Sequence, residues 1–147
     1  MAGAVLEIKS KELATLNKRL VKWFAKIDKP SEAMELIATH LESQTRRRIE
    51  EERADSESRA WPEWSEKYAK TRHENQNLLQ NEGDLVDDIA PDSGADFAKA
   101  YVTMIYARTH QLGDKKRNIP ARPYLGLSKV NAKDIENEIA KFIEAAL

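Results

Sequence analysis

The chain has 147 residues, of which 41% are hydrophobic and 33% charged, with a formal net charge of −1 and no cysteine. The length suits one globular domain over residues 1–147, the near-neutral charge gives no overall attraction to nucleic acid or membranes, and the absence of cysteine excludes disulfides and thiolate chemistry. A chain without cysteine is compatible with a reducing cytoplasm or a virion. We see no signal peptide at the start and no apolar run near the ~20 residues that span a bilayer.

The first half of the chain predicts a short strand followed by two long helices. The strand would span Ala4–Lys9, where apolar residues alternate, and Ser10 would cap the helix that follows. Apolar residues then recur at steps of three and four over residues 13–27, and again over residues 34–49. Pro30 fits the first turn of the second helix, because that position tolerates the proline ring.

Three consecutive arginines, Arg46–Arg48, close the apolar stripe of the second helix. Each has a glutamate four residues later, in Glu50–Glu52, and such pairs stabilise an exposed helix by about 0.2–0.5 kcal/mol each. We interpret the triplet as a solvated, self-neutralised helix face. A patch that binds phosphate or a partner is the alternative.

Two tryptophans, Trp61 and Trp64, flank a proline after a polar connection over Ala54–Ala60. Because an indole carries a large apolar surface, we expect the pair to anchor this connection on the core, with a subunit interface as the alternative. The next segment, Ser65–Asn77, is predicted to be a short polar helix or a loop that holds Tyr68.

A hairpin is predicted in the second half of the chain. Its strands would be Leu85–Ala90 and Phe97–Tyr106, joined by the turn-rich connection Pro91–Asp96. Asp87 and Asp88 would then point to opposite faces of a strand, which keeps them from sharing an acid site.

A basic loop and a proline-rich segment follow the predicted hairpin. The segment from Arg108 to Arg122 contains five basic residues and one aspartate. It could form a surface that binds phosphate, and the alternative is a mobile loop exposed to solvent. The two prolines of Ile119–Ser128 hold the backbone extended, as an edge strand or strap that presents Arg122. For Arg122 we weigh a partner contact against a structural ion pair or carbonyl contact.

The C-terminal segment predicts a closing helix. Asn131 would cap it, with Asp134 in the capping-box position, and the apolar stripe would run from Ile135 to Ile143. The expected class is α+β, with a small antiparallel sheet packed with two long N-terminal helices and a C-terminal helix.

The residues that could carry chemistry are scattered. The histidines are His40, His73 and His110, and none has a second histidine at metal-ligand spacing. Gly113 and Gly126 are isolated, so they do not form a glycine-rich phosphate loop. We therefore predict no enzymatic activity, no cofactor and no metal.

The spacing of two elements near the end of the chain resembles a known family. They are Tyr106-Ala107 followed by His110-Gln111-Leu112-Gly113, and then Ile119-Pro120-Ala121-Arg122-Pro123-Tyr124-Leu125-Gly126-Leu127-Ser128. The pattern is similar to the phage virion morphogenesis family, the tail-completion group of contractile-tailed, Mu-like phages and prophages. Upstream, the tryptophan pair and the spacing of Leu78, Gly83, Leu85 and Ile89 extend the resemblance over nearly the whole chain. The chain departs from the family pattern at Glu82, Ala54–Ala60 and Tyr124, which bears on local turns.

The resemblance implies a structural subunit that acts late in tail assembly, completing the tail or joining it to the head, and that forms a ring. Its implied partners are other copies of itself and tail or head–tail connector proteins, with non-specific DNA contact left open, in the virion and in the host cytoplasm during assembly. Candidate partner or DNA contacts are Arg108, Lys115, Lys116, Arg117 and Arg122, and candidate interface or anchor residues are Trp61, Trp64 and Tyr124. The alternative is a small nucleic-acid-binding regulator that uses the arginine-rich helix or the basic loop.

Overall fold

The computed structural model describes residues 11–146 apart from positions 26, 29, 74–75 and 81–82. The predicted strand Ala4–Lys9 and its neighbour Ser10 lie outside the described residues. The elements in chain order are α1 (Lys11–Phe24), α2 (Pro30–Arg47), a turn of π-helix η1 (Arg48–Glu52), α3 (Glu66–Ala69), α4 (Asp84–Asp88), β1 (Ala90–Ser93), β2 (Ala98–Tyr101), α5 (Ala107–Leu112) and α6 (Lys129–Ala146).

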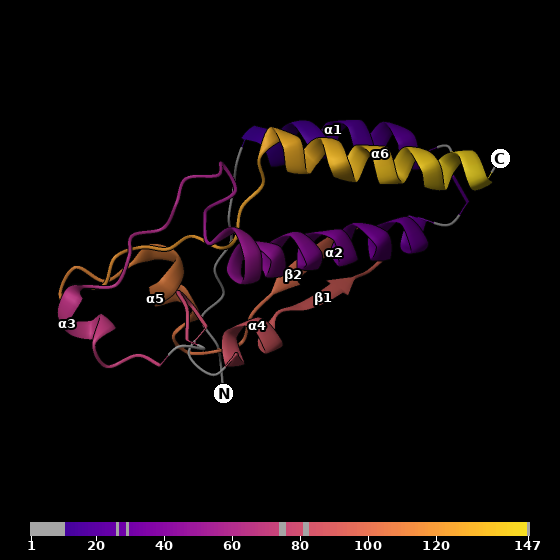
Figure 1. The fold of residues 1–147 in the computed structure, drawn as a ribbon. Helices are drawn as coiled ribbons and strands as arrows, with labels where there is room; N and C mark the ends of the chain where they lie inside the picture. The colour runs from indigo at the N-terminus through magenta and orange to yellow at the C-terminus, as the bar shows by residue number, and fades with distance from the viewer. Residues whose placement is uncertain (1–10, 26, 29, 74–75, 81–82, 147) are drawn as a thin grey trace.

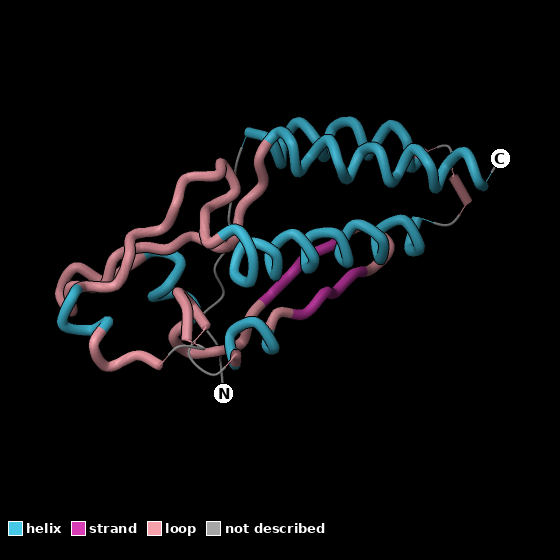
Figure 2. The backbone as a smooth tube through the Cα atoms, in the orientation of Figure 1, coloured by secondary structure: helices cyan, strands magenta, loops and turns pink. Residues whose placement is uncertain are grey.

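Helices and sheet form layers on either side of α2 (Figure 1). α1 and α6 lie side by side in one outer layer, and the antiparallel pair β1–β2 packs against the opposite side of α2. The short helices α3 and α5 and most of the loops gather at one end of the molecule (Figure 2). The predicted α+β class is confirmed.

Buried apolar side chains form two clusters. The first lies between α1, α2 and α6, where the predicted helical stripes meet; it contains Leu16, Leu20, Ala33, Ile37, Leu127, Ala132, Ile135 and Ile139. The second joins η1 to the loops, α4 and α5; it contains Ile49, Trp61, Leu78, Leu85, Val86, Ile89, Ala107 and Tyr124. The second cluster therefore holds the loops of this end against η1, α4 and α5 through buried side chains, because these loops lack regular backbone pairing.

The strand predicted over Leu85–Ala90 is wrong for most of its length, because helix α4 covers Asp84–Asp88 and only Ala90 lies in a strand. Gly83 precedes the helix in the left-handed conformation, with φ of 85°, which glycine adopts without steric cost. The apolar residues Leu85, Val86 and Ile89 are all buried, and their spacing fits one turn of helix as well as a strand. A run this short could not be assigned from its period alone.

The hairpin exists, but its strands are shifted from the predicted ones. β1 occupies Ala90–Ser93, so it starts at the last residue of the first predicted strand and continues into the segment predicted as a turn; it pairs antiparallel with Ala98–Tyr101. The second strand is shorter than predicted because the Asp88 carboxylate accepts the backbone N–H groups of Thr103 and Met104 and the Thr103 hydroxyl. Burial alone would raise the pKa of Asp88, but these hydrogen bonds together hold that pKa below its ordinary value.

The predicted cap of the closing helix is also wrong by one turn. The helix begins at Lys129, and Ser128 is the capping residue, since its Oγ accepts the N–H of Asn131 at 3.1 Å. Asn131 returns the bond, accepting the N–H of Ser128 on Oδ1 at 3.1 Å. This is a reciprocal capping box with asparagine in the third helical position, where glutamate or glutamine is usual.

Candidate functional site

The segment Ile119–Ser128, called the proline strap below, is extended but pairs with no strand among the described residues. Other parts of the chain satisfy its backbone instead. The indole Nε1 of Trp61 donates to the carbonyl of Pro123 at 2.8 Å, and the guanidinium of Arg48 donates to the carbonyl of Tyr124 at 3.0 Å. The strap is therefore fixed in place by side chains from distant parts of the sequence.

Gln111 of α5 makes three hydrogen bonds to the strap. Its Oε1 accepts the N–H groups of Tyr124 and Leu125 at 3.1 and 2.9 Å, and its Nε2 donates to the carbonyl of Leu125 at 3.0 Å. The Gln111 side chain is buried, and so is its bond to Tyr124, while its two bonds to the half-buried Leu125 are partly shielded from water. One amide thus does for the strap what a neighbouring strand would do in a sheet.

Tyr124 is the best-buried side chain of the strap, with 1% of its surface exposed, and its hydroxyl donates to the carbonyl of Ala107 at 2.9 Å. Burial raises the pKa of this phenol, with a smaller contribution from Asp88. Trp61 is likewise buried, at 4%. Both side chains act as anchors inside this chain, which is one of the two roles predicted for them.

Arg122 makes the carbonyl contacts that were weighed against a partner contact. Its Nε donates to the carbonyl of Pro62 at 2.8 Å and its Nη2 to the carbonyl of Glu63 at 3.2 Å. The backbone N–H of Arg122 donates to the carbonyl of His110 at 2.7 Å. Through these bonds Arg122, a residue that is 7% exposed, joins the strap to the segment Trp61–Trp64, and burial lowers the pKa of its guanidinium.

Gly113 is required where α5 meets the strap. Its φ of 76° suits glycine, and a Cβ there would lie 2.7 Å from the backbone nitrogen of Ala121. The "histidine-glutamine-x-glycine" element of the sequence therefore has a structural meaning, because Gln111 bonds to the strap and Gly113 lets it approach.

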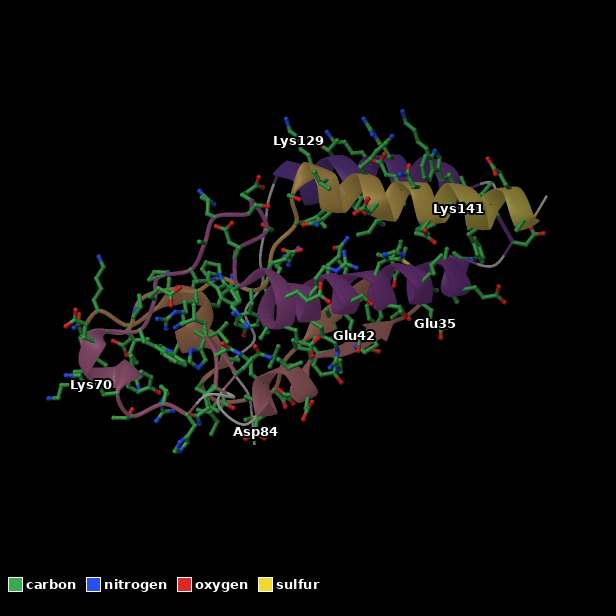
Figure 3. All side chains as sticks on the ribbon, viewed as in Figure 1. Glu35, Glu42, Lys70, Asp84, Lys129 and Lys141 are labelled. Atoms are coloured by element: carbon green, nitrogen blue, oxygen red, sulfur yellow. The ribbon has the colours of Figure 1, made fainter. Side chains whose placement is uncertain are left out.

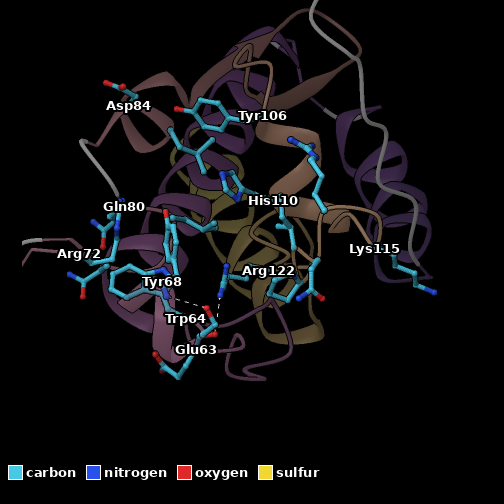
Figure 4. A pocket seen from close by; sticks show the side chains of 18 residues that line it. Glu63, Trp64, Tyr68, Arg72, Gln80, Asp84, Tyr106, His110, Lys115 and Arg122 are labelled. Carbon is cyan, nitrogen blue, oxygen red and sulfur yellow. Dashed lines mark hydrogen bonds between the residues drawn. The ribbon is translucent and has the colours of Figure 1, made fainter. Parts of the chain in front are cut away.

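A pocket of about 1040 Å³ opens at this end of the molecule, between α3, α5 and the strap (Figure 4). Its aromatic lining is Trp64, Tyr68 and Tyr106, its cations include Arg72, Arg117 and Arg122, and its carboxylates are Glu63 and Asp84. We call this the aromatic pocket. Trp64 and Tyr68 meet edge to face with ring centroids 6.0 Å apart, and the guanidinium of Arg72 lies 4.5 Å from the centroid of the Tyr68 ring.

The sequence predictions missed three residues of this pocket, Tyr68, Arg72 and Tyr106, as site residues. A signal for two of them was present. Trp64, Tyr68 and Arg72 are spaced four apart, a spacing that would place them on one face of a helix. Of the three, only Tyr68 lies in α3, which Ser65 caps by accepting the N–H of Tyr68; Trp64 precedes this short helix and Arg72 follows it.

His110 lines the aromatic pocket beside Tyr106, with ring centroids 5.4 Å apart. Its Nδ1 is buried and has no hydrogen-bond partner among the described residues. Burial, and to a smaller extent the charge of Arg122, lower the pKa of the imidazole below its usual 6.5. The folded protein therefore favours the neutral ring at neutral pH.

This lowered pKa predicts a loss of stability in mild acid. Because the folded pKa lies below the unfolded one, protonation favours the unfolded chain, and the stability present above about pH 6.5 is lost as the pH falls through the folded pKa. Urea unfolding should give a lower free energy of unfolding at pH 5 than at pH 7.5, and His110→Gln should reduce that difference. If the variant keeps the full pH dependence, another group is responsible.

The candidate contacts of the basic loop do not share one environment. The Nε of Arg117 pairs with Asp114 at 2.7 Å, so this loop neutralises part of its own charge. Arg108, Lys115 and Lys116 are exposed, and within the described residues they make no ion pair. Figure 4 shows the Lys115 side chain pointing away from the centre of the pocket.

The interpretation of Arg46–Arg48 as a solvated face is wrong for two of the three arginines. Arg48 is buried, at 2% exposure, and bonds to the Tyr124 carbonyl and, at 2.7 Å, to Oδ1 of Asn131. Arg46 pairs with Glu42 at 3.0 Å and donates to the carbonyl of Ile89 at 2.7 Å. Of the three, Arg47 is exposed and lies 3.9 Å from Glu51, as the i,i+4 spacing predicts.

The three histidines lie on separate parts of the fold. His40 of α2 approaches Glu138 of α6 at 3.8 Å, while His110 lies at the aromatic pocket. Among the described residues, no three His, Asp or Glu side chains are grouped so that they could hold a metal ion. No helix in that part of the chain has the length and apolar character needed to cross a membrane.

Comparison with known proteins agrees with the sequence resemblance. Putative capsid assembly protein G of Escherichia phage Mu is 31% identical over 122 residues, which cover 76% of this chain and 78% of the relative. The uncharacterized protein MJ0331 of Methanocaldococcus jannaschii is 35% identical over 49 residues, a third of either chain. No solved structure matches. The model of the phage virion morphogenesis family matches residues 11–144, and the chain belongs to this family.

Proposed function

We propose that this protein is a structural subunit, without catalysis, that completes the phage tail or joins it to the head, and that it works as a self-associated ring. The observation that carries the proposal is the family match over residues 11–144. The Mu relative carries the name of a capsid assembly protein, which supports a role in building the virion. The place of action would be the virion and, during assembly, the host cytoplasm.

The aromatic pocket supports contact with another virion protein. Tryptophan, tyrosine and arginine are the residue types that most often dominate the binding energy of protein interfaces, and the pocket brings together Trp64, Tyr68, Arg72 and Tyr106. Tyr68 is 47% exposed and Tyr106 39% exposed, so their rings can gain burial when a partner binds. We assign the pocket to a tail or head–tail connector protein.

Deleting the gene from the phage that encodes it tests this proposal. Electron microscopy of the lysate should show complete heads and tails that are not joined, with plaques restored when the wild-type protein is supplied in trans. Tyr68→Ala combined with Tyr106→Ala should fail to restore plaques at equal soluble amounts. Lys70→Ala, an exposed change near α3 outside the pocket lining, should restore them. Joined infectious particles from the deletion phage would rule the proposal out.

Non-specific DNA contact is the second candidate function, and exposed Arg108, Lys115 and Lys116 favour it. The arginine-rich helix does not support it, because Arg46 and Arg48 bond to the protein itself. Duplex binding through the three exposed cations should weaken steeply with salt and should drop further when all three are changed to glutamine. No binding at low salt would remove this candidate.

A further inference from the structure

A groove of about 470 Å³ lies between α1 and α6, on the layer farthest from the hairpin. It is lined by Arg19, Lys22 and Trp23 of α1 and by Lys133, Glu136 and Asn137 of α6. The guanidinium of Arg19 donates to both carboxylate oxygens of Glu136 at 2.9 Å, so this pair is internally neutral. Lys22 and Lys133 are exposed and have no ion pair with a described residue, which leaves the groove basic beside a half-buried indole.

The hairpin carries the opposite charge. Asp92 of β1 and Asp96 of the turn are exposed, and α4, which precedes β1 in the chain, carries exposed Asp84 and Asp87. Lys99 of β2 offsets part of the negative charge of the hairpin, because its Nζ lies 3.6 Å from Oδ2 of Asp92 on the paired strand. Phe97 and Tyr101 are 43% and 40% exposed on the same strand and its turn, and the Lys99 ammonium lies over both rings. With Lys99 paired to Asp92, the carboxylate of Asp96 leaves the hairpin with one net negative charge beside two exposed aromatic rings.

The basic groove and the acidic hairpin lie on opposite sides of α2, so they cannot meet within one chain (Figure 1). In the same view, Figure 3 shows Lys129 of α6 and Asp84 of α4 at the two outer edges of the molecule. Two complementary surfaces on opposite sides of one molecule allow copies to stack head to tail, the heterologous contact that generates rings or filaments. The net charge of −1 means that little overall repulsion opposes such stacking.

We propose that the groove lined by Lys22, Trp23 and Lys133 receives the hairpin of a second copy of this chain, through Asp92, Asp96 and Phe97. The inference rests on the ring of the proposed function and names the surfaces that would build it. Opposite charges steer and orient the contact, and burial of the Phe97 ring beside the Trp23 indole supplies its apolar part. A groove of this volume admits one or two side chains, which matches the tip of a two-stranded hairpin.

Charge reversal on each surface gives a selective test. The groove variant is Lys22→Glu with Lys133→Glu, and the hairpin variant is Asp92→Lys with Asp96→Lys. Sedimentation velocity of the full chain should show concentration-dependent association of the wild type that weakens at high salt. Each variant alone should associate at least about tenfold more weakly than the wild type, because its groove and its hairpin then carry charge of the same sign. An equimolar mixture of the two should recover association, since each groove then has a hairpin of opposite charge.

Two controls keep the test specific. Lys67→Glu with Lys70→Glu reverses two exposed charges near α3, away from both surfaces, and should leave association unchanged. Thermal unfolding must show that the hairpin variant folds, because it places a second ammonium opposite Lys99.

Three results would overturn the inference. They are a wild type that stays monomeric at millimolar concentration, variants that associate like the wild type, and a mixture that does not recover. If neither variant changes association, the copies would still form a ring, but through surfaces other than the groove and the hairpin. The deletion phage reports on the tail-completion role independently of all of these.

Discussion

Replacing Gln111 with leucine is expected to lower the free energy of unfolding by roughly 2–4 kcal/mol, because a buried backbone group left without a partner costs about 1–3 kcal/mol and a half-buried one, which water can reach, costs less. Three groups lose their partner at once: the N–H of Tyr124 and both the N–H and the carbonyl of Leu125. Leucine keeps a similar volume, so a cavity adds little to the loss. A domain of this size is commonly stable by about 5–15 kcal/mol, so the change takes a large fraction of the total.

Urea unfolding followed by tryptophan fluorescence would measure this loss, and native-state hydrogen exchange would locate it. The amides of Tyr124 and Leu125 should exchange much faster in Gln111→Leu. Amides in the middle of α6 should exchange faster only by the amount that the loss of global stability explains. Arg108→Leu, an exposed change on the same helix, should stay within about 0.5 kcal/mol of the wild type. Equal protection of the strap amides in both proteins would show that another group holds the strap.

The role of Gln111 explains why the strap could be located from the sequence but its partners could not. Two prolines three apart force an extended backbone by local sterics, and that part of the prediction needed no tertiary information. Which groups satisfy the backbone is a long-range matter. Arg48 reaches Tyr124 from 76 positions away and Trp61 reaches Pro123 from 62 away, and no local pattern encodes these pairings.

The helices show the same division between local and distant information. The stripes of α1, α2 and α6 were predictable because a helix that buries one face must repeat apolar residues at its own period. The segment around α4 was not, because three apolar residues in five positions fit a helical turn and a strand equally well. There the decision fell to Gly83 at its start and to Asp88 at its end, through a left-handed turn and through hydrogen bonds to Thr103 and Met104.

The aromatic pocket was predicted only in part for a similar reason. Arg117, Arg122 and Lys115 were named from the basic loop, and the pocket does include them. Tyr68 and Arg72 come from a segment about 40 positions earlier, and the second cluster of buried residues brings the two segments together. Arg48 was misjudged because its charge and its neighbouring glutamates favour an exposed helix face, while the fold buries it against two oxygen acceptors.

Arg48→Met is expected to destabilise the protein by about 2–4 kcal/mol, since hydrogen bonds to a charged donor contribute more than neutral ones. The carbonyl of Tyr124 loses its guanidinium donor, whereas Oδ1 of Asn131 keeps the N–H of Ser128. The desolvation cost of the guanidinium opposes this loss of stability. Burial lowers the pKa of Arg48, which means that keeping this cation inside the fold is itself unfavourable. Methionine fills much of the same volume without a charge, so the measured loss is the difference between these two effects.

The matched control for this change is the neighbouring arginine. Arg47→Met removes an exposed side chain that lies 3.9 Å from Glu51, and it should change stability by no more than about 0.5 kcal/mol. Arg48→Lys keeps the charge but offers a single ammonium in place of two guanidinium nitrogens. Its loss in free energy of unfolding should therefore lie between those of Arg47→Met and Arg48→Met. A fully stable Arg48→Met would mean that desolvation cancels both hydrogen bonds, and that Gln111, Trp61 and Arg122 suffice to hold the strap.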